Sequence, residues 1–150
     1  MSVAVEYLAN RASETQIAEH LLCCNADFVP TLSERVEIRD YAQKIASNAT
    51  RFEAWSNGTL VGLVAAYCND HEARIVHITS VSVLREWAGK GIAAKLMNQC
   101  NEYAKTAGMW RISLEVAAHN APAIKLYEKC GFIAGKVTDT CVLMNLYLKS

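Results

Sequence analysis

The chain has 150 residues, a mass of 16.5 kDa, and 15 basic against 15 acidic side chains, so its formal net charge is zero. Apolar residues make up 52% of it, which suffices for one sizeable core and excludes a disordered or fibrous protein. The balanced charge offers no general attraction to nucleic acid or to an anionic membrane surface. We therefore expect a single domain, residues 1–150, that recognises its partners locally.

The chain carries no sign of membrane insertion or secretion. No run reaches the roughly 18 to 20 consecutive apolar residues that cross a bilayer. Glu6 interrupts the first apolar run and no basic segment precedes it, so a secretory signal is not expected. We predict a cytoplasmic protein with neither a membrane nor a nucleic acid as partner.

The amino-terminal third predicts a strand followed by two helices. Apolar and polar residues alternate over residues 3–7, as in a strand with one buried face. Ser13 with Gln16 resembles a capping box, and helical spacing of apolar residues then continues to about Asn25. A second helix is predicted over residues 33–48.

The rest of the chain predicts strands around two more helices. Asn57-Gly58 is a strong hairpin signal between β-rich segments. Gly131 is a good stop signal for the last helix, which carries Pro122 in its first turn. With the first three elements, these give the order βααβββαβαββ. The remaining segments are strands at 52–56, 60–67, 75–83, 111–117, 132–137 and 141–148, and helices from Ile92 to Tyr103 and over residues 120–130.

Two glycines lie between the strand that ends near Leu84 and the helix that begins near Ile92. In the segment Ala88-Gly89-Lys90-Gly91-Ile92-Ala93 they allow a tight turn and a close approach to a ligand. The first amides of a helix have no internal partners and favour anions, and Lys90 adds charge. The same spacing also makes an ordinary tight connection. It is neither G-x-G-x-x-G nor a Walker loop, which disfavours a dinucleotide or a nucleoside triphosphate.

A second motif favours the ligand-binding interpretation. The segment 120–132 reads N-x-x-A-x-x-L-Y-x-x-x-G-F directly after a strand. Together with the glycine loop it strongly resembles the GNAT superfamily of acyl-CoA-dependent N-acyltransferases, firmly over residues 75–132. The resemblance implies an α/β fold, classed as α+β in some schemes: a mixed, mainly antiparallel sheet of about seven strands flanked by about four helices. Two parallel central strands would splay apart to hold acetyl-CoA.

The resemblance also assigns cofactor contacts. The loop Ala88 to Ala93 would bind the pyrophosphate through Ala88, Gly89, Lys90, Gly91, Ile92 and Ala93. Backbone groups of Val81 and Val83 would pair with the pantetheine arm, and Asn120 and Tyr127 would also contact the cofactor. The family usually has Arg or Gln where this chain has Ala88. One phosphate contact is therefore lost, which implies weaker binding of CoA or a degenerate member.

Amide formation needs an unprotonated amine and a proton for the leaving thiolate. In the family the tyrosine at the position of Tyr127 often acts as general acid; a tyrosine packed on a helix face is the alternative. Glu115 is the best candidate base, and partial burial would raise its pKa toward the working range. The alternative is a solvated strand residue. His77 and Glu72 are second-rank bases, while His71 and His119 are expected in exposed loops.

Metal and thiol chemistry have little support. No His and Cys residues recur at zinc-ligand spacing, so no metal is expected. The six cysteines show neither C-x-x-C pairs nor the spacing of a disulfide framework, and we interpret them as buried thiols.

The sequence thus predicts an acetyl-CoA-dependent N-acetyltransferase that transfers the acetyl group directly to a primary amine. The acceptor would enter between residues 25–33 and the hairpin at 137–141, with Phe28, Tyr41 and Asp139 as conceivable contacts. A small molecule, an amino sugar and a peptide amino terminus remain open as acceptors. The alternative is a non-catalytic acyl-CoA-binding or interaction domain, and a homodimer through the edge of the last strand, 141–148, is a further option.

Overall fold

The structure is a computed structural model that describes residues 4–148. Its elements follow the predicted order, with three short 3₁₀ helices (η) in the connections. The strands are β1 (Glu6–Ala9), β2 (Thr50–Ser56), β3 (Thr59–Asp70), β4 (Ile75–Val83), β5 (Arg111–Ala117), β6 (Ile133–Val137) and β7 (Cys141–Tyr147). The helices are α1 (Glu14–Cys24), η1 (Asn25–Asp27), η2 (Leu32–Glu34), α2 (Ile38–Asn48), η3 (Arg85–Trp87), α3 (Ile92–Thr106) and α4 (Ala121–Lys129).

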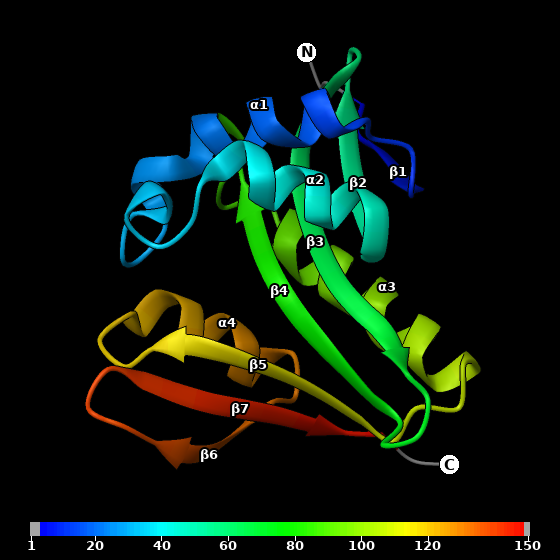
Figure 1. Ribbon diagram of the computed structural model, residues 1–150, viewed down its shortest axis with the longest axis vertical. Helices are drawn as coiled ribbons and strands as arrows, with labels where there is room; N and C mark the ends of the chain where they lie inside the picture. Colours follow the sequence, from blue (N-terminus) through cyan, green and yellow to red (C-terminus); the bar gives the residue numbers. More distant parts are fainter. Residues whose placement is uncertain (1–3, 149–150) are drawn as a thin grey trace.

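Seven strands form one sheet in the order β1-β2-β3-β4-β5-β7-β6. Every neighbouring pair is antiparallel except β4 with β5. Within residues 4–148, these two parallel strands pair only at Ile75, Val76 and His77 of β4. Beyond His77 they diverge, and a wedge opens between them (Figure 1). The predicted mixed sheet with splayed central strands is confirmed.

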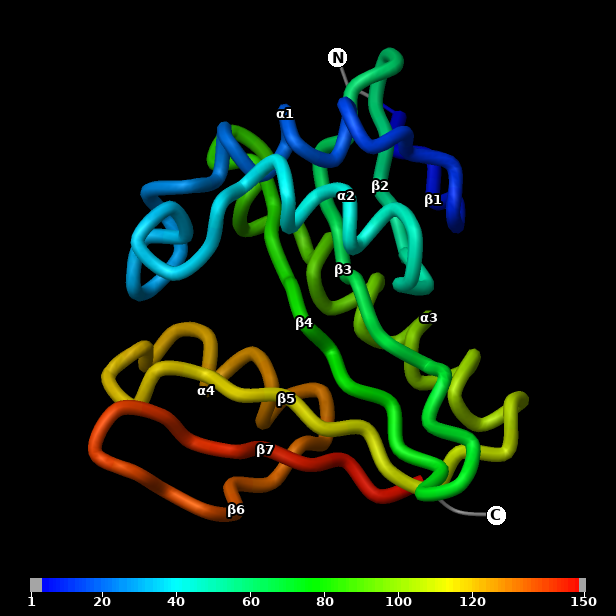
Figure 2. Tube along the Cα trace, in the orientation of Figure 1, coloured from blue at the N-terminus to red at the C-terminus, as the bar shows by residue number. Residues whose placement is uncertain are grey.

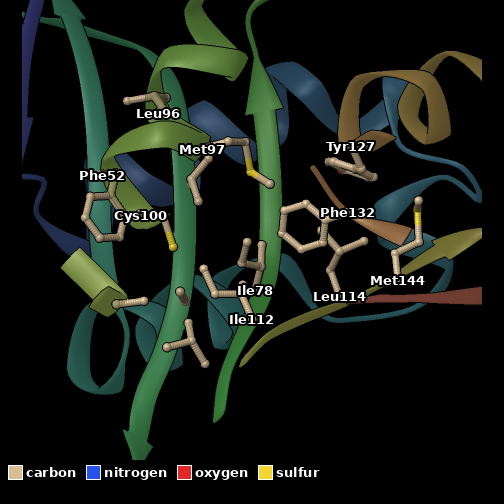
Figure 3. Close-up of a cluster of buried hydrophobic side chains, with 14 of the residues drawn as sticks. Phe52, Ile78, Leu96, Met97, Cys100, Ile112, Leu114, Tyr127, Phe132 and Met144 are labelled. Carbon is tan, nitrogen blue, oxygen red and sulfur yellow. The ribbon is translucent and has the colours of Figure 1, made fainter. Parts of the chain in front are cut away.

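Helices cover both faces of the sheet. Residues of α1 and α2 pack with Leu60 and Leu63 of β3 in one cluster on one face. On the other face, α3 and Tyr127 of α4 join a second cluster with β2 to β5 and β7. Figure 3 shows this second cluster, in which Leu96 and Met97 of α3 meet the strands. The tube in Figure 2 traces α3 as the crossover that connects the parallel strands β4 and β5.

A buried carboxylate fixes the segment before α1 to the sheet. Glu53 of β2 is fully buried and accepts hydrogen bonds from the Ala12 amide and from Trp55 Nε1. Arg51 Nε lies 3.2 Å from Glu53 Oε2, and its Nη2 donates to Ala12 O. Because a buried charge is costly unless it is paired and hydrogen-bonded, this network fixes the path of the chain into α1.

Three expectations about the elements are corrected. The second helix begins at Ile38, not at Ser33, because Ser33 lies in η2 and its amide donates to Asn25 Oδ1 at 2.7 Å. The first strand is Glu6–Ala9; of its predicted range, residue 3 lies outside the described residues. The last strand, β7, lies between β5 and β6, so it has no free edge, and a dimer through it is ruled out.

Candidate functional site

The splay between β4 and β5 forms a cleft of about 1360 Å³. Its walls come from β4, β5, the glycine loop, the start of α3 and α4. The segment after α1 and residues 139–141 border it as well. Elements far apart in the sequence therefore meet at one cavity, and its size lies above the range of ordinary small-molecule pockets. It can hold an extended ligand.

The glycine loop leaves the amino terminus of α3 bare. Gly89 and Gly91 have φ of 77° and 79°, the left-handed region that favours glycine. Gly91 is the N-cap residue, and no side chain caps the helix. In contrast, α1, α2 and α4 are capped by Ser13, Glu37 and Asn120. The first amides of α3 are therefore free to bind an anion at the positive end of the helix dipole.

The cleft brings together nearly all of the residues that sequence reasoning selected. It does not include Lys90, which is exposed but is not part of the lining. Ala88 lines the cleft, and its amide donates a hydrogen bond to Arg85 O. Because its side chain is a methyl group, this position offers no cationic group to a phosphate. The selected residues that line the cleft are Val81, Val83, Ala88, Gly89, Gly91, Ile92, Ala93, Glu115, Asn120 and Tyr127.

Val81 and Val83 lie on the part of β4 that no longer pairs with β5. They pair with Val64 and Gly62 of β3 on one side. On the other side the β4 and β5 ladder has already ended at His77. Within the described chain, the β5-facing backbone edge of this segment therefore has no strand partner, and main-chain groups there can bind a ligand that lies in the wedge.

Tyr127 serves the core and the cleft together. Its side chain is 8% exposed, and its ring lies 6.2 Å from that of Phe132 between centroids. Burial raises the pKa of the Tyr127 phenol to about 12, because the charged phenolate is poorly solvated there. Tyr127 therefore packs in the core, as the structural interpretation expected, and it also lines the cleft, while its role as an acid stays a prediction. At neutral pH its hydroxyl keeps a proton that it can donate.

The candidate base differs from expectation in its burial. Glu115 lines the cleft from β5, opposite Leu143 of β7, but it is exposed. The predicted partial burial is wrong, because Glu115 points away from the core face that holds Leu114 and Val116. Of the other candidates, His77 and Glu72 are exposed and do not line the cleft. His119 is exposed, as expected, yet it is a lining residue.

The predicted entry for the acceptor agrees in part with the cleft. Phe28 and Asp139 line it, and Asp27 there forms an ion pair with Arg85 of η3. Tyr41 does not line it, because its hydroxyl donates to Thr79 O at 2.7 Å. An exposed side chain, Arg35, adds a positive charge at this end of the cleft.

Sequence reasoning missed two polar residues of β4. Ser80 and Ser82 are buried and line the cleft, and Ser82 is hydrogen-bonded to His20 of α1. The only signal was the alternation of serine with Val81 and Val83. The sequence showed His20 only as one residue of the apolar stripe of α1, because the pairing with Ser82 spans 62 positions.

The cysteines are free thiols, but only some are buried. Cys24, Cys68 and Cys100 are buried as expected, whereas Cys23 is exposed. Cys130 and Cys141 are half-buried. Across residues 4–148, no three His, Cys, Asp or Glu side chains gather closely enough to hold a metal ion. Nor does any helix in that range have the length and apolarity to cross a membrane.

Comparison with known proteins identifies the family. The model of the acetyltransferase (GNAT) family matches residues 14–132, which is most of the chain. The chain belongs to this family.

The individual relatives match over shorter segments. An uncharacterised N-acetyltransferase of Methanocaldococcus jannaschii is 35% identical over 80 residues, 51% of this chain and 35% of the relative. The catalytic subunit of the N-terminal acetyltransferase B complex of Arabidopsis thaliana is 41% identical over 58 residues, 38% of this chain and 33% of the relative. The chain thus matches about a third of the length of each.

Solved structures agree with the fold over almost the whole chain. An acetyltransferase of Salmonella typhimurium, solved with its cofactor acetyl-CoA, superposes with a TM-score of 0.77. The superposition covers 97% of this chain and 95% of that one, at 19% sequence identity. Identity this low shows a shared fold alone.

Proposed function

We propose that the protein is an acetyl-CoA-dependent N-acetyltransferase that moves an acetyl group directly to a primary amine, and that residues 1–150 form one such domain. The observation that carries this proposal is the cleft between β4 and β5. It brings the glycine loop, the free edge of β4, Tyr127 and Glu115 to one cavity. Membership of the acetyltransferase (GNAT) family supports the same activity.

The residues of the cleft fit an acyl-CoA. The bare amides at the start of α3 would hold the pyrophosphate, with no side-chain cap to displace. A Cβ at Gly89 or Gly91 would meet nothing within 4 Å, so the space beside the loop is open. Backbone groups of Val81 and Val83 would pair with the pantetheine arm. Asn120 caps α4 through its Oδ1, which leaves its amide nitrogen free to donate to the ligand.

The chemistry needs two protons to leave the nitrogen of the acceptor, one before and one during the attack, and one proton to reach the departing thiolate. Acetyl-CoA supplies the acyl group as a thioester. Glu115 would take the proton of the acceptor's ammonium form through water before the attack, as its exposed position on β5 allows. Tyr127 would give its proton to the sulfur of the departing thiol. Because burial keeps this phenol protonated at neutral pH, Tyr127 can serve as the acid throughout the ordinary working range.

The charges at the mouth of the cleft disfavour a strongly charged acceptor. Arg35 and the Asp27–Arg85 pair face that end of the cleft together with Asp139. This mixture of signs gives no strong field for a polycation or a polyanion. A small amine, an amino sugar or a peptide amino terminus fits it, and the last agrees with the activity named for the Arabidopsis relative.

A second candidate function is a non-catalytic acyl-CoA-binding or interaction domain. Ala88 favours it, because an alanine stands where the family usually has Arg or Gln to contact a phosphate. The lost contact reduces affinity without removing the main-chain cradle. This candidate predicts binding of acetyl-CoA with no release of thiol.

Two measurements decide between these functions. Acetyl-CoA is titrated into the protein by calorimetry, with desulfo-CoA and adenosine diphosphate as controls. Thiol release is then followed over a panel that contains small amines, amino sugars and short peptides. Micromolar binding with release on addition of one acceptor class supports the transferase. Binding without release supports an acyl-CoA-binding domain, and no binding at millimolar CoA excludes the transferase and leaves an interaction domain in which Ala88 marks a lost site.

A further inference from the structure

A buried histidine lies directly behind the cleft wall. His20 of α1 is 3% exposed and lies against β3 and β4. Its Nδ1 is 2.8 Å from Leu60 O, and its Nε2 is 2.8 Å from Ser82 Oγ. Both ring nitrogens are therefore within hydrogen-bond distance of a protein partner. The imidazole is held in one orientation by two strands.

The two partners determine where the proton of the imidazole lies. Leu60 O is a carbonyl oxygen and can only accept, so Nδ1 carries a proton and donates it. Burial lowers the pKa of His20, so the ring is neutral and Nε2 carries a lone pair. Of the two protonated groups beside Nε2, the Ser82 hydroxyl at 2.8 Å is closer than the Cys24 thiol at 3.7 Å, and we assign it as the donor. The Ser82 oxygen is left with lone pairs that can accept a hydrogen bond from something else.

Ser82 is also part of the cleft wall. Ser82 lines the cleft between Val81 and Val83, the two residues whose backbone would hold the pantetheine arm. Its side chain is on the face of β4 that α1 covers. Two positions along the same face, the Ser80 hydroxyl is buried without a hydrogen-bond partner, and Ser80 also lines the cleft. A buried hydroxyl of this kind beside a cavity is available to a polar group of a bound ligand.

We propose that Ser82 binds the nitrogen of the acceptor amine and takes its proton, with His20 as the positioning residue that receives a proton in turn. This inference rests on the proposed acetyl transfer. As the nitrogen bonds to the acyl carbon it loses one proton to Ser82 Oγ, and the Ser82 proton passes to His20 Nε2. The bond from the acyl carbon to sulfur breaks, and Tyr127 gives its proton to that sulfur. The phenolate of Tyr127 and the imidazolium of His20 then return to neutral by proton exchange through water.

Few other ionisable groups lie near the pair. Cys24, one turn further along α1, has its sulfur 3.7 Å from His20 Nε2. Burial raises the pKa of Cys24 to about 12, so this thiol keeps its proton and does not compete as a base. Asp27 of η1 and Glu86 of η3 act on Cys24 from further away. The hydrogen-bond partners of the ring are Leu60 O of β3 and Ser82 Oγ of β4, neither of which carries a charge.

Two substitutions test the proton path. Ser82→Ala removes the group that accepts from the amine. His20→Gln supplies an amide that can donate to Leu60 O and accept from Ser82 but cannot take a proton. The matched control is Ser56→Ala, which removes another buried serine hydroxyl, on β2, outside the cleft lining. Each variant is checked for folding by circular dichroism and for acetyl-CoA binding by calorimetry.

We expect kcat to fall about a hundredfold in Ser82→Ala and in His20→Gln, the lower range for loss of general base catalysis. The KM for acetyl-CoA and its affinity stay unchanged, and Ser56→Ala keeps the parental kcat. A solvent deuterium isotope effect on kcat in the parent shrinks in both variants. A role confined to stability would lower the folded fraction and leave kcat per folded molecule and the isotope effect as they are.

The outcomes separate the two proposals. If the parent releases no thiol with any amine, the acetyltransferase itself is wrong. If the parent is active and either folded variant keeps kcat within about threefold, the proton path is wrong. Nitrogen NMR of the His20 ring in the parent gives a further test that needs no variant, since a protonated Nε2 in the folded protein at neutral pH would overturn the assignment.

Discussion

At the scale of single residues, the sequence identified Tyr127 as a candidate site residue but missed Ser82 and His20. Tyr127 was found because it lies in a local motif of 13 residues, 120–132. Its burial could not be predicted, because Phe132 and the facing strands supply it. Ser82 and His20 were missed for the converse reason, since neither is part of a motif and the fold alone brings them together.

Replacing Tyr127 by phenylalanine tests its role as the acid. Tyr127→Phe keeps the ring that packs on Phe132 and loses the proton donor, so we expect kcat to fall by about 10² or more with acetyl-CoA affinity unchanged. Thiol-release kinetics and calorimetry measure the two quantities. The control is Tyr103→Phe, on an exposed residue of α3 outside the cleft lining. An unchanged kcat in Tyr127→Phe would remove this residue from the mechanism.

The pKa of Tyr127 also predicts the alkaline side of the pH profile. A phenol titrates near 10 in water, and burial moves that of Tyr127 up to about 12. The acid is active in its protonated form, which persists below the raised pKa. We therefore expect no loss of kcat from this group between about pH 8 and 10. A fall in kcat with a midpoint near 10, absent from Tyr127→Phe, would contradict this.

At the scale of elements, the sequence predicted the start of α1 correctly and the start of α2 incorrectly. The capping box of Ser13 and Gln16 is present as predicted, with both hydrogen bonds between residues three positions apart. Ser33 looked equally suitable but hydrogen-bonds Asn25 across the loop, and Glu37 caps α2 instead. Competition between neighbouring polar side chains decides such cases, and the sequence does not show which pairing is satisfied.

The packing of α3 on the sheet depends on one glycine. A methyl group at Gly62 of β3 would lie 2.8 Å from Ile92 Cγ2 and 3.3 Å from Leu96 Cδ1. We expect Gly62→Ala to lower the free energy of unfolding by about 1 to 3 kcal/mol, measured by urea denaturation. Because Ile92 is the first residue of α3, displacement of the helix should also weaken acetyl-CoA binding.

A double variant checks the cause. Ile92→Ala removes the atom that the new methyl group would meet, so the costs of Gly62→Ala and Ile92→Ala should sum to more than the cost of the pair. Strict additivity of the two changes would show that the loss in Gly62→Ala does not come from contact with α3.

At the scale of the whole molecule, the strand order was only partly within reach of the sequence. The hairpin at Asn57-Gly58 is local, and it is confirmed. The position of β7 next to β5 is set by pairing between residues far apart in the sequence, such as Arg111 and Tyr147. An apolar strand near the carboxyl terminus reads the same whether it lies inside a sheet or at its edge, so the prediction of an edge failed.

Acetyl-CoA should join the two parts of the sheet. Between β4 and β5 only three residue pairs form a ladder, so a ligand in the wedge replaces hydrogen bonds that the strands do not make with each other. At a free concentration of 100 times its Kd, we expect about 2.7 kcal/mol of added stability, seen as a higher Tm. Hydrogen exchange should slow in β4 and β5 together. Binding without slower exchange in β5 would place the ligand elsewhere.

The uncapped start of α3 affects how the sequence of this protein can evolve. An anion cradle made of main-chain amides depends on the path of the backbone, which Gly89 and Gly91 set by their positive φ. Most other side chains around these amides can be substituted without altering their arrangement. Under the proposed function, the part of the cleft that holds the donor is therefore tolerant of mutation, whereas Arg35 and Asp139 line the end that the acceptor would enter. New acceptor preferences can arise here by few substitutions while the donor stays the same.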